Sequence, residues 1–248
     1  MKYVVVVPTF NEAENVEPFV HRLRQHQPVI DVVFVDDSSP DGTGDIVRRM
    51  ALSDPHLHLL IRDARRGYAA ACRDGFAWCL ANGSEAVVTM DCDLSHDPAS
   101  IAVLLARADG GADLVIGSRY VKGGRVDNWP LHRRLLSRWG NRYTAAMLRI
   151  PFTDCTSGFR VYRRDCLEAV GAARSSAEGY AFLTEMLRLV TSDPRWSATE
   201  TPIVFTDRTR GRSKMSASIV LESIVLVTRW GVALRLRGRR HPRRRPVR

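Results

Sequence analysis

Two aspartates separated by one residue, Asp91 and Asp93, end an apolar run in the stretch VVTMDCDLSHDP (residues 87–98). Because side chains at positions i and i+2 of an extended strand point to the same side, these carboxylates can be presented together. Two ionised carboxylates side by side repel each other unless a positive charge lies between them. Mg²⁺ commonly binds one or two carboxylates together with substrate phosphates. The pair therefore predicts a divalent metal site.

A structural explanation also exists for acidic residues at this point, since aspartate followed by proline is a favourable start for a helix. Asp97 and Pro98 already supply that start for the next segment. Asp91 and Asp93 are then left without a structural task, and we favour metal binding for them. His96 is a further candidate ligand, although a single loop histidine is more often an ordinary polar residue.

The elements that must position these carboxylates alternate between short apolar runs and helical patterns over the first 120 residues. Strands are expected at Tyr3–Val7, Val32–Val35, Leu57–Ile61, Ala86–Met90 and Leu114–Ile116. Helical patterns lie between them, near residues 14–25, 43–52, 67–82 and 98–108. Apolar strands joined by helices predict an α/β fold with a mostly parallel sheet covered on both faces. Ligands of such sheets bind at the carboxyl ends of the strands.

Polar side chains follow four of the five expected strands. They are Asn11 and Glu12, Asp36 and Asp37, Asp91 and Asp93, and Ser118 and Arg119. These clusters meet at one edge of the predicted sheet and together indicate a binding site. The second half of the chain is less regular, with helices expected near 135–148 and 179–191 and a strand at Pro202–Thr206.

The net charge of +10 is carried mainly by the C-terminal end of the chain. Residues 235–248 contain eight arginines and no acidic residue, and the rest of the chain holds 29 basic and 27 acidic residues. A nucleic-acid-binding protein led by this arginine-rich end is an alternative, but the nearly neutral body shows no basic stripe with interleaved aromatic residues. Five scattered cysteines without a C-x-x-C pair favour reduced thiols in a cytoplasm.

The C-terminal region is expected to differ from the body of the chain. We expect one domain over residues 1–214, an amphipathic or half-buried helix over 215–236, and an arginine-rich, disordered tail over 237–248. Three charged residues between Ala217 and Leu236 disfavour a membrane span. The arginines beyond this helix suit an anionic membrane surface. A core helix followed by a solvated tail is an equally weighted alternative.

Seven segments in register carry a family resemblance. They read PTFNEAEN, VDDSSPDGTGD, MDCDLSHDP, IGSRYVKGG, CTSGFRVY, GYAFLTE and TPIVFTDRTRGRSK. In this order they resemble the dolichol-phosphate (polyprenyl-phosphate) mannose synthase group of family 2 glycosyltransferases, from about residue 3 to residue 216. The resemblance implies a GT-A fold, a Rossmann-like mixed and mostly parallel sheet typical of nucleotide-diphospho-sugar transferases. It also implies transfer of mannose from GDP-mannose to a polyprenyl (dolichyl-type) monophosphate, with inversion of the anomeric centre.

The resemblance further implies roles for individual residues. Those expected to bind the nucleotide sugar are Pro8, Phe10, Glu12, Val35, Asp37, Asp91, Cys92, Asp93, Arg208 and Lys214. Those expected to hold Mg²⁺ or Mn²⁺ are Asp91, Asp93 and Ser95. Those expected to bind the acceptor phosphate are Arg119, Arg133 and Ser137, and catalysis is expected to depend on Asp91, Asp93 and Arg119.

The implied reaction is chemically consistent with these residue types. A divalent cation can neutralise the charge that develops on a nucleoside diphosphate leaving group. A phosphate monoester with a second pKa near 6 is largely ionised at neutral pH and is already a nucleophile. It needs neutralisation and in-line positioning, which arginines supply, rather than a general base. Arg119 and Lys214 are therefore expected to matter more than any histidine.

A related family 2 enzyme with another nucleotide sugar, such as UDP-glucose, or with a hydroxyl acceptor is the alternative. Phe10 stands where relatives usually carry tyrosine, Ala69 where a glycine is common and Leu183 where a glutamine is usual. A hydroxyl acceptor would need a general base. The Q-x-x-R-W signature of processive polysaccharide synthases is missing. Because the acceptor is a lipid and no transmembrane helix is evident, we expect a cytoplasmic enzyme, peripheral on the inner face of the membrane.

Overall fold

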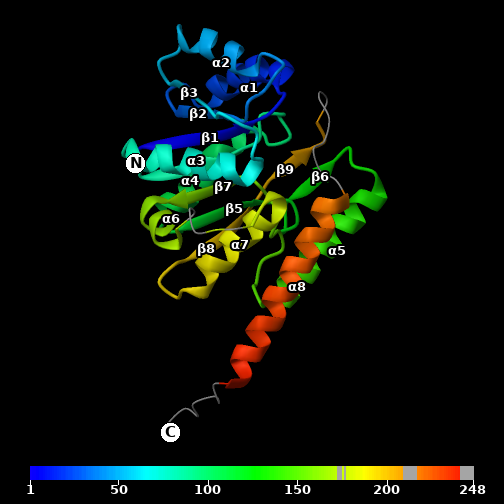
Figure 1. The fold of residues 1–248 in the computed structure, drawn as a ribbon. Helices are drawn as coiled ribbons and strands as arrows, with labels where there is room; N and C mark the ends of the chain where they lie inside the picture. Colours follow the sequence, from blue (N-terminus) through cyan, green and yellow to red (C-terminus); the bar gives the residue numbers. More distant parts are fainter. Residues whose placement is uncertain (172–174, 176, 209–216, 241–248) are drawn as a thin grey trace.

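A seven-stranded mixed sheet forms the centre of the protein (Figure 1). The computed structural model describes residues 1–171, 175, 177–208 and 217–240. The sheet has the order β3-β2-β1-β4-β7-β5-β8. Its strands are β1 (Tyr3–Thr9), β2 (Asp31–Asp36), β3 (Leu57–Ile61), β4 (Ala86–Thr89), β5 (Leu114–Ser118), β7 (Arg160–Arg163) and β8 (Ala198–Pro202). Strand β7 runs antiparallel to both of its neighbours, and the other pairings are parallel.

Helices cover both faces of this sheet. They are α1 (Ala13–His26), α2 (Thr43–Ala51), α3 (Tyr68–Ala81), a 3₁₀ turn (Pro98–Ser100), α4 (Ile101–Asp109), α5 (Leu131–Leu148), α6 (Arg164–Val170), α7 (Gly179–Ser192) and α8 (Ala217–Arg240). Two short strands, β6 (Arg125–Asp127) and β9 (Val204–Thr206), pair in parallel apart from the main sheet. The predicted α/β fold with a mostly parallel sheet is confirmed.

The alternating valines of β1 explain why the sheet is covered twice. Val4 and Val6 pack into the core with Phe76 of α3, whereas Val5 and Val7 pack with Phe19 of α1. All four valines are fully buried. Because successive residues of a strand point to opposite faces, a run of valines makes both faces apolar and requires a helical layer on each.

Several boundaries differ from the sequence-based expectation. The strand expected at Pro202–Thr206 is two strands, β8 and β9, which join different ladders on either side of Ile203. Strand β7 was not expected, since its arginine termini hide its apolar centre. Helix α5 begins at Leu131, directly after Pro130, rather than near residue 135. Helix α8 continues to Arg240, four residues into the segment expected to be disordered; residues 241–248 lie outside the described part.

Helices α5 and α8 lie side by side and extend beyond the edge of the sheet (Figure 1). A side chain at Gly231 of α8 would place its Cβ 2.7 Å from Met147 Cε and 2.8 Å from the Met147 carbonyl oxygen, so glycine is required where the helices approach. The hydroxyls of Tyr143 and Thr228 are hydrogen-bonded at 2.6 Å across the same contact. Among the described residues, no helix combines the length and apolar character needed to cross a bilayer.

Candidate active site

A first cavity lies at the carboxyl ends of β1, β2 and β4, where the polar clusters were expected to meet. Its lining includes eight of the residues proposed for the nucleotide sugar: Pro8, Phe10, Glu12, Asp37, Asp91, Cys92, Asp93 and Arg208. Val35 is instead fully buried in the core. Lys214 lies outside the described residues. Asp91 and Asp93 line one cavity, but β4 ends at Thr89, so the turn after the strand brings them there and not the alternation of an extended strand.

The chain turns sharply just after Asp93, and this turn shapes the acidic part of the cavity. Leu94 adopts a left-handed conformation with φ of 59°, which is strained for a residue other than glycine. The turn lets the Ser95 N–H donate to Asp93 Oδ1 at 3.0 Å. On the other side, Arg208 Nη2 lies 3.1 Å from Asp93 Oδ2. Asp93 is thus held in one orientation, with a positive charge beside it.

These residues fit a divalent cation. Ser95 Oγ is buried, and among the described residues it has no hydrogen-bond partner, although it lies next to Asp93. A buried hydroxyl oxygen beside a carboxylate is a ligand of the type that Mg²⁺ accepts. Within the described part of the chain, no three His, Cys, Asp or Glu residues form a metal-binding group. A cation here would depend on Asp91 and Asp93 together with oxygens of a bound diphosphate.

His96 is buried and does not behave as an exposed polar loop residue. Its Nδ1 accepts a hydrogen bond from the Asp91 N–H at 3.3 Å. Burial lowers the pKa of His96 to about 4, so the ring is neutral at physiological pH. With Nδ1 as an acceptor, the ring proton lies on Nε2. The imidazole therefore supports the backbone of the loop that carries Asp91 and Asp93.

Asp37 shapes one wall of the first cavity through its hydrogen bonds. Its carboxylate accepts from Arg62 Nη1 at 2.5 Å, from the Arg66 N–H at 3.0 Å and from the Gly67 N–H at 2.7 Å. Gly67 has a φ of 88°, a conformation that favours glycine. Asp37 thus fixes the loop that starts α3, and this loop forms a wall of the cavity.

Phe10 also lines the first cavity. The guanidinium carbon of Arg65 lies 4.0 Å from the centroid of the Phe10 ring, within cation–π distance. Both side chains line the cavity. A flat cationic group over an aromatic ring makes this corner suitable for a nucleobase, whose face can stack on either group.

A second cavity adjoins the first and is lined by α5, α8 and the loops beside them. It contains the three residues proposed for the acceptor phosphate, Arg119, Arg133 and Ser137. Its other walls are largely apolar, with Trp129, Leu136, Trp139, Tyr143, Phe205, Val220, Ile224 and Val227. Among the described residues that line it, none is Asp or Glu. The second cavity is therefore basic at one end and apolar along its length.

The two cavities share Gly158 and Arg208. A Cβ atom at Gly158 would lie 2.9 Å from the Tyr68 hydroxyl and 3.9 Å from His96 Cε1. A larger residue there would fill the junction. A group bound in one cavity can thus meet a group bound in the other, between Gly158 and Arg208.

Arg119 is held rigidly at the basic end of the second cavity by Asp154, a fully buried carboxylate. Arg119 Nε and Nη2 donate to the two Asp154 oxygens, each at 2.7 Å, and the Arg119 N–H donates to Oδ2 at 3.0 Å. Burial alone would raise the pKa of Asp154, but the charge and hydrogen bonds of Arg119 outweigh it and hold that pKa below its ordinary value. The pair is therefore ionised at neutral pH.

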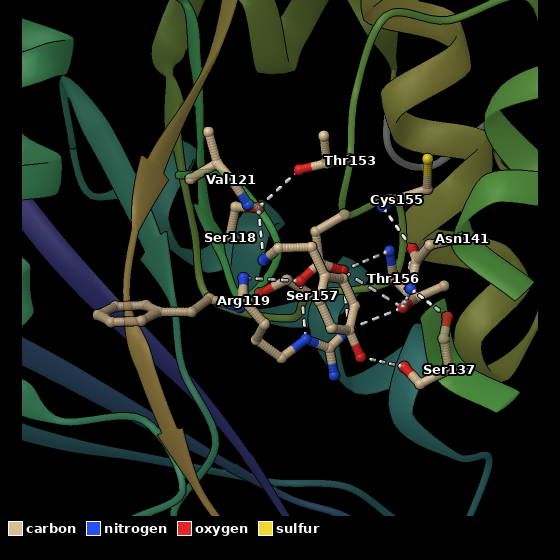
Figure 2. Close-up of polar contacts among 12 residues, drawn as sticks. Ser118, Arg119, Val121, Ser137, Asn141, Thr153, Cys155, Thr156 and Ser157 are labelled. Carbon is tan, nitrogen blue, oxygen red and sulfur yellow. Dashed lines mark hydrogen bonds and ion pairs between the residues drawn. The ribbon is translucent and has the colours of Figure 1, made fainter. Parts of the chain in front are cut away.

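A polar network continues from this pair to helix α5 (Figure 2). Arg119 Nη2 also donates to Thr156 Oγ1 at 2.9 Å. Asn141 of α5 accepts from the Cys155 N–H at 2.7 Å and donates to the Ser137 carbonyl at 2.9 Å. Residues from three separate segments are thus fixed relative to one another around the second cavity.

Glu200 of β8 holds the backbone around Asp154 by hydrogen bonds. Its Oε1 accepts from the Asp154 N–H at 2.9 Å and from the Thr153 hydroxyl at 2.8 Å, and its Oε2 accepts from the Thr153 N–H at 2.9 Å. Sequence analysis did not single out Asp154 or Glu200. Asp154 directly precedes the CTSGFRVY segment, and the need of a buried arginine for an acidic partner is the signal that could have found it.

The fold is that of a GT-A glycosyltransferase, with an acidic cavity beside a basic one. The chain belongs to the family Glycosyl transferase family 2, whose model matches residues 4–171.

Two curated proteins with similar sequences have names that describe the joining of mannose to a polyprenyl phosphate. The chain is 41% identical over 234 residues to a polyprenol monophosphomannose synthase of Mycolicibacterium smegmatis, which covers 94% of this chain and 88% of that protein. It is 43% identical over 241 residues to an undecaprenyl-phosphate mannosyltransferase of Micrococcus luteus, and the match covers 97% of this chain and 98% of that protein.

The fold is also similar to that of a mannosyltransferase from Pyrobaculum calidifontis, solved in complex with GDP-Man and Mn²⁺. The TM-score is 0.53, with 19% identity, over 97% of this chain and 76% of that one.

Proposed function

We propose that the protein transfers mannose from GDP-mannose to a polyprenyl monophosphate, with inversion of the anomeric centre. The observation that carries this proposal is the meeting of two unlike cavities at Gly158 and Arg208. One presents the D-x-D carboxylates, and the other presents arginines at the end of an apolar groove. The names of the two curated relatives, both of which combine a polyprenyl phosphate with mannose, support the same pair of substrates.

The donor is proposed to bind in the first cavity, with its base near Phe10 and Arg65 and its diphosphate near Asp91 and Asp93. Mg²⁺ or Mn²⁺ held by these two aspartates, with Ser95 as a further ligand, would neutralise the charge that develops on the leaving diphosphate. The Pyrobaculum mannosyltransferase was solved with GDP-Man and Mn²⁺, which supports this assignment. Arg208 lies beside Asp93 and adds a positive charge at the junction.

The acceptor phosphate is proposed to bind at the basic end of the second cavity. Arg119, Arg133 and Arg208 all line it, and Asp154 keeps the Arg119 guanidinium in one plane. The ionised phosphate can attack the anomeric carbon directly, since it carries its own nucleophilic oxygen. The lack of a lining carboxylate among the described residues of this cavity favours a phosphate over a hydroxyl acceptor, which needs a general base.

The lipid part of the acceptor is proposed to lie along α5 and α8, which also attach the enzyme to the membrane. Exposed apolar side chains on these two helices are Leu131, Leu135, Leu136, Trp139, Leu221, Val225, Val232 and Leu236. They occur together with arginines, a combination typical of helices that lie in the interface of anionic membranes. This supports a peripheral position on the inner, cytoplasmic face, where a nucleotide sugar is available.

The experiment that tests this function supplies purified protein and Mn²⁺ with GDP-mannose or UDP-glucose, and with a short-chain polyprenyl phosphate or the corresponding alcohol. We expect a mannosyl phospholipid, detected by mass spectrometry, from GDP-mannose and the phosphate alone. Product from UDP-glucose, or from the alcohol, would contradict the proposed donor or acceptor respectively.

A further inference from the structure

His96 occupies the wall between the two cavities. It lines the second cavity, while its Nδ1 faces the backbone of Asp91, a residue of the first. The side chain is only 2% exposed, although it carries a polar ring. A buried neutral imidazole in such a position is held by specific contacts on each side.

The Nδ1 edge of the His96 ring contacts the backbone of Asp91, a residue of the first cavity. The Asp91 N–H donates to His96 Nδ1, and this bond fixes the backbone from which the Asp91 carboxylate projects. Because Nδ1 points at a backbone amide, it is directed to the loop itself rather than into the cavity as a metal ligand.

The His96 ring also packs against two phenylalanines, of which Phe205 lines the second cavity and Phe159 belongs to the buried core. His96 packs against Phe159, with ring centroids 5.1 Å apart, and against Phe205, with centroids 5.3 Å apart. An isolated β-bridge also joins the backbones of His96 and Phe205. His96 and Phe205 are therefore joined through both side chains and main chain.

Phe205 in turn contacts the basic end of the second cavity. The guanidinium carbon of Arg119 lies 5.5 Å from the Phe205 ring, and the Trp129 ring lies 5.3 Å from it. The guanidinium group of Arg133 stacks on the Trp129 ring, with its carbon 4.0 Å from the ring centroid. Contacts thus run without interruption from the loop that carries Asp91 and Asp93, through His96, to both arginines proposed to bind the acceptor phosphate.

We propose that His96 is a positioning residue. It keeps the loop that carries Asp91, where the donor's metal is proposed to bind, aligned with Phe205, which lies beside the arginines proposed for the acceptor phosphate. This inference rests on the proposed function, because it concerns the alignment of the two substrates of that reaction. The Nδ1 atom fixes the donor side, and the aromatic faces fix the acceptor side. Each half of the side chain therefore has a separate effect that substitution can isolate.

Two variants separate these effects. His96→Phe keeps a ring between Phe159 and Phe205 but removes the Nδ1 acceptor. His96→Asn keeps an acceptor oxygen near the position of Nδ1 but removes the ring. His96→Ala removes both and serves as the reference for complete loss. Thermal unfolding of each variant reports whether the fold is intact.

The test measures the Kd of Mn²⁺·GDP by calorimetry and the KM of a short-chain polyprenyl phosphate. For His96→Phe we expect Mn²⁺·GDP to bind about tenfold more weakly, the loss of one buried hydrogen bond, with the acceptor KM within twofold of wild type. For His96→Asn we expect the reverse, a Kd within threefold of wild type and an acceptor KM raised about fivefold. Phe205→Leu, which leaves the Asp91 bond in place, should change only the acceptor KM.

The proposal is supported if His96→Phe mainly weakens Mn²⁺·GDP binding while His96→Asn mainly raises the acceptor KM. Equal losses at both substrates in both ring variants, or no loss in either, would overturn it, because a residue that only fills space does not distinguish Nδ1 from the ring faces. If His96→Asn does not fold, His96→Phe and Phe205→Leu still decide the donor and acceptor arms separately. Wild-type protein that fails to bind Mn²⁺·GDP would instead refute the proposed function.

Discussion

The two cavities are built in different ways, although they meet at one point. The first lies at the carboxyl ends of the parallel strands β1, β2 and β4, which are neighbours in the sheet and bring their carboxylates to one edge. The second is formed by helices and loops from distant parts of the chain, held together by a buried network around Asp154. A strand-end site depends on regular backbone geometry, whereas a site between helices depends on specific side-chain pairs.

The difference extends to charge. In the first cavity the group proposed to act is a carboxylate, and an arginine beside it, Arg208, compensates its charge. In the second cavity the group proposed to act is an arginine, and the buried carboxylate of Asp154 compensates and orients it. Substitutions in one cavity should therefore affect one substrate, and measurements on both substrates test whether the separation holds.

The largest expected effect comes from Asp93→Asn. It halves the negative charge of the D-x-D pair while keeping the shape, and we expect kcat to fall about 10³-fold, because metal stabilisation of the leaving group is worth several kcal/mol. Mn²⁺·GDP binding should weaken in calorimetry. Binding of a short-chain polyprenyl phosphate, followed by the fluorescence of Trp129 and Trp139 in the second cavity, should change much less, because Arg208 is the one of the three arginines proposed for the phosphate that pairs with Asp93. Activity within tenfold of wild type would contradict the donor-site assignment.

Asp154→Asn should have the next largest effect and the opposite selectivity. It leaves the buried Arg119 without its anionic partner, so we expect kcat/KM for the acceptor to fall about 10²-fold and the free energy of unfolding to fall by about 3 kcal/mol. The Kd of Mn²⁺·GDP should stay within twofold. Asp45→Asn, which removes an exposed ion pair with Arg48, is the matched control and should change neither quantity. Equal weakening of both substrates would show that the cavities are not separable.

The pH dependence of stability gives an independent measure of the same pair. The folded-state pKa of Asp154 lies below its ordinary value of 3.8, so the stabilisation is fully present above that pH and is lost as the pH falls through the folded pKa. The difference in unfolding free energy between wild type and Asp154→Asn should be constant from pH 5 to pH 8 and should shrink below about pH 4. Urea denaturation at several pH values checks this. A difference that grows on acidification would be inconsistent with the ion pair.

The smallest expected effect concerns the outer surface of the second cavity's helices. Leu135→Asp and Leu221→Asp place a charge on exposed apolar positions of α5 and α8, and each should reduce binding to anionic vesicles about tenfold in a flotation assay. Activity on a short-chain, water-soluble acceptor should be unchanged. Leu52→Asp, at an exposed position after α2, is the control and should bind vesicles like wild type. Equal loss in the control would indicate a general effect of charge.

Sequence reasoning reached the first cavity more completely than the second, and the construction of each explains why. The D-x-D pair and Asp37 follow buried strands, so the rule for parallel sheets brings them together without any side-chain detail. The pairing of Arg119 with Asp154, and the support of Asp154 by Glu200, join residues far apart in sequence. No periodicity predicts such a pairing. The antiparallel insertion of β7 between β4 and β5 was missed because its polar ends mask a short apolar core.

The glycine at position 231 sets how closely α8 approaches α5, and so the width of the second cavity. Because α8 rests on Met147 at that point, a larger residue would push the two helices apart. Val227, Ile224 and Val220, which lie one to three turns earlier on α8, line the second cavity and would be displaced with it. Side chains of graded size at this single position are therefore expected to widen that cavity by graded amounts, and a series of acceptors with tails of different width would measure the change.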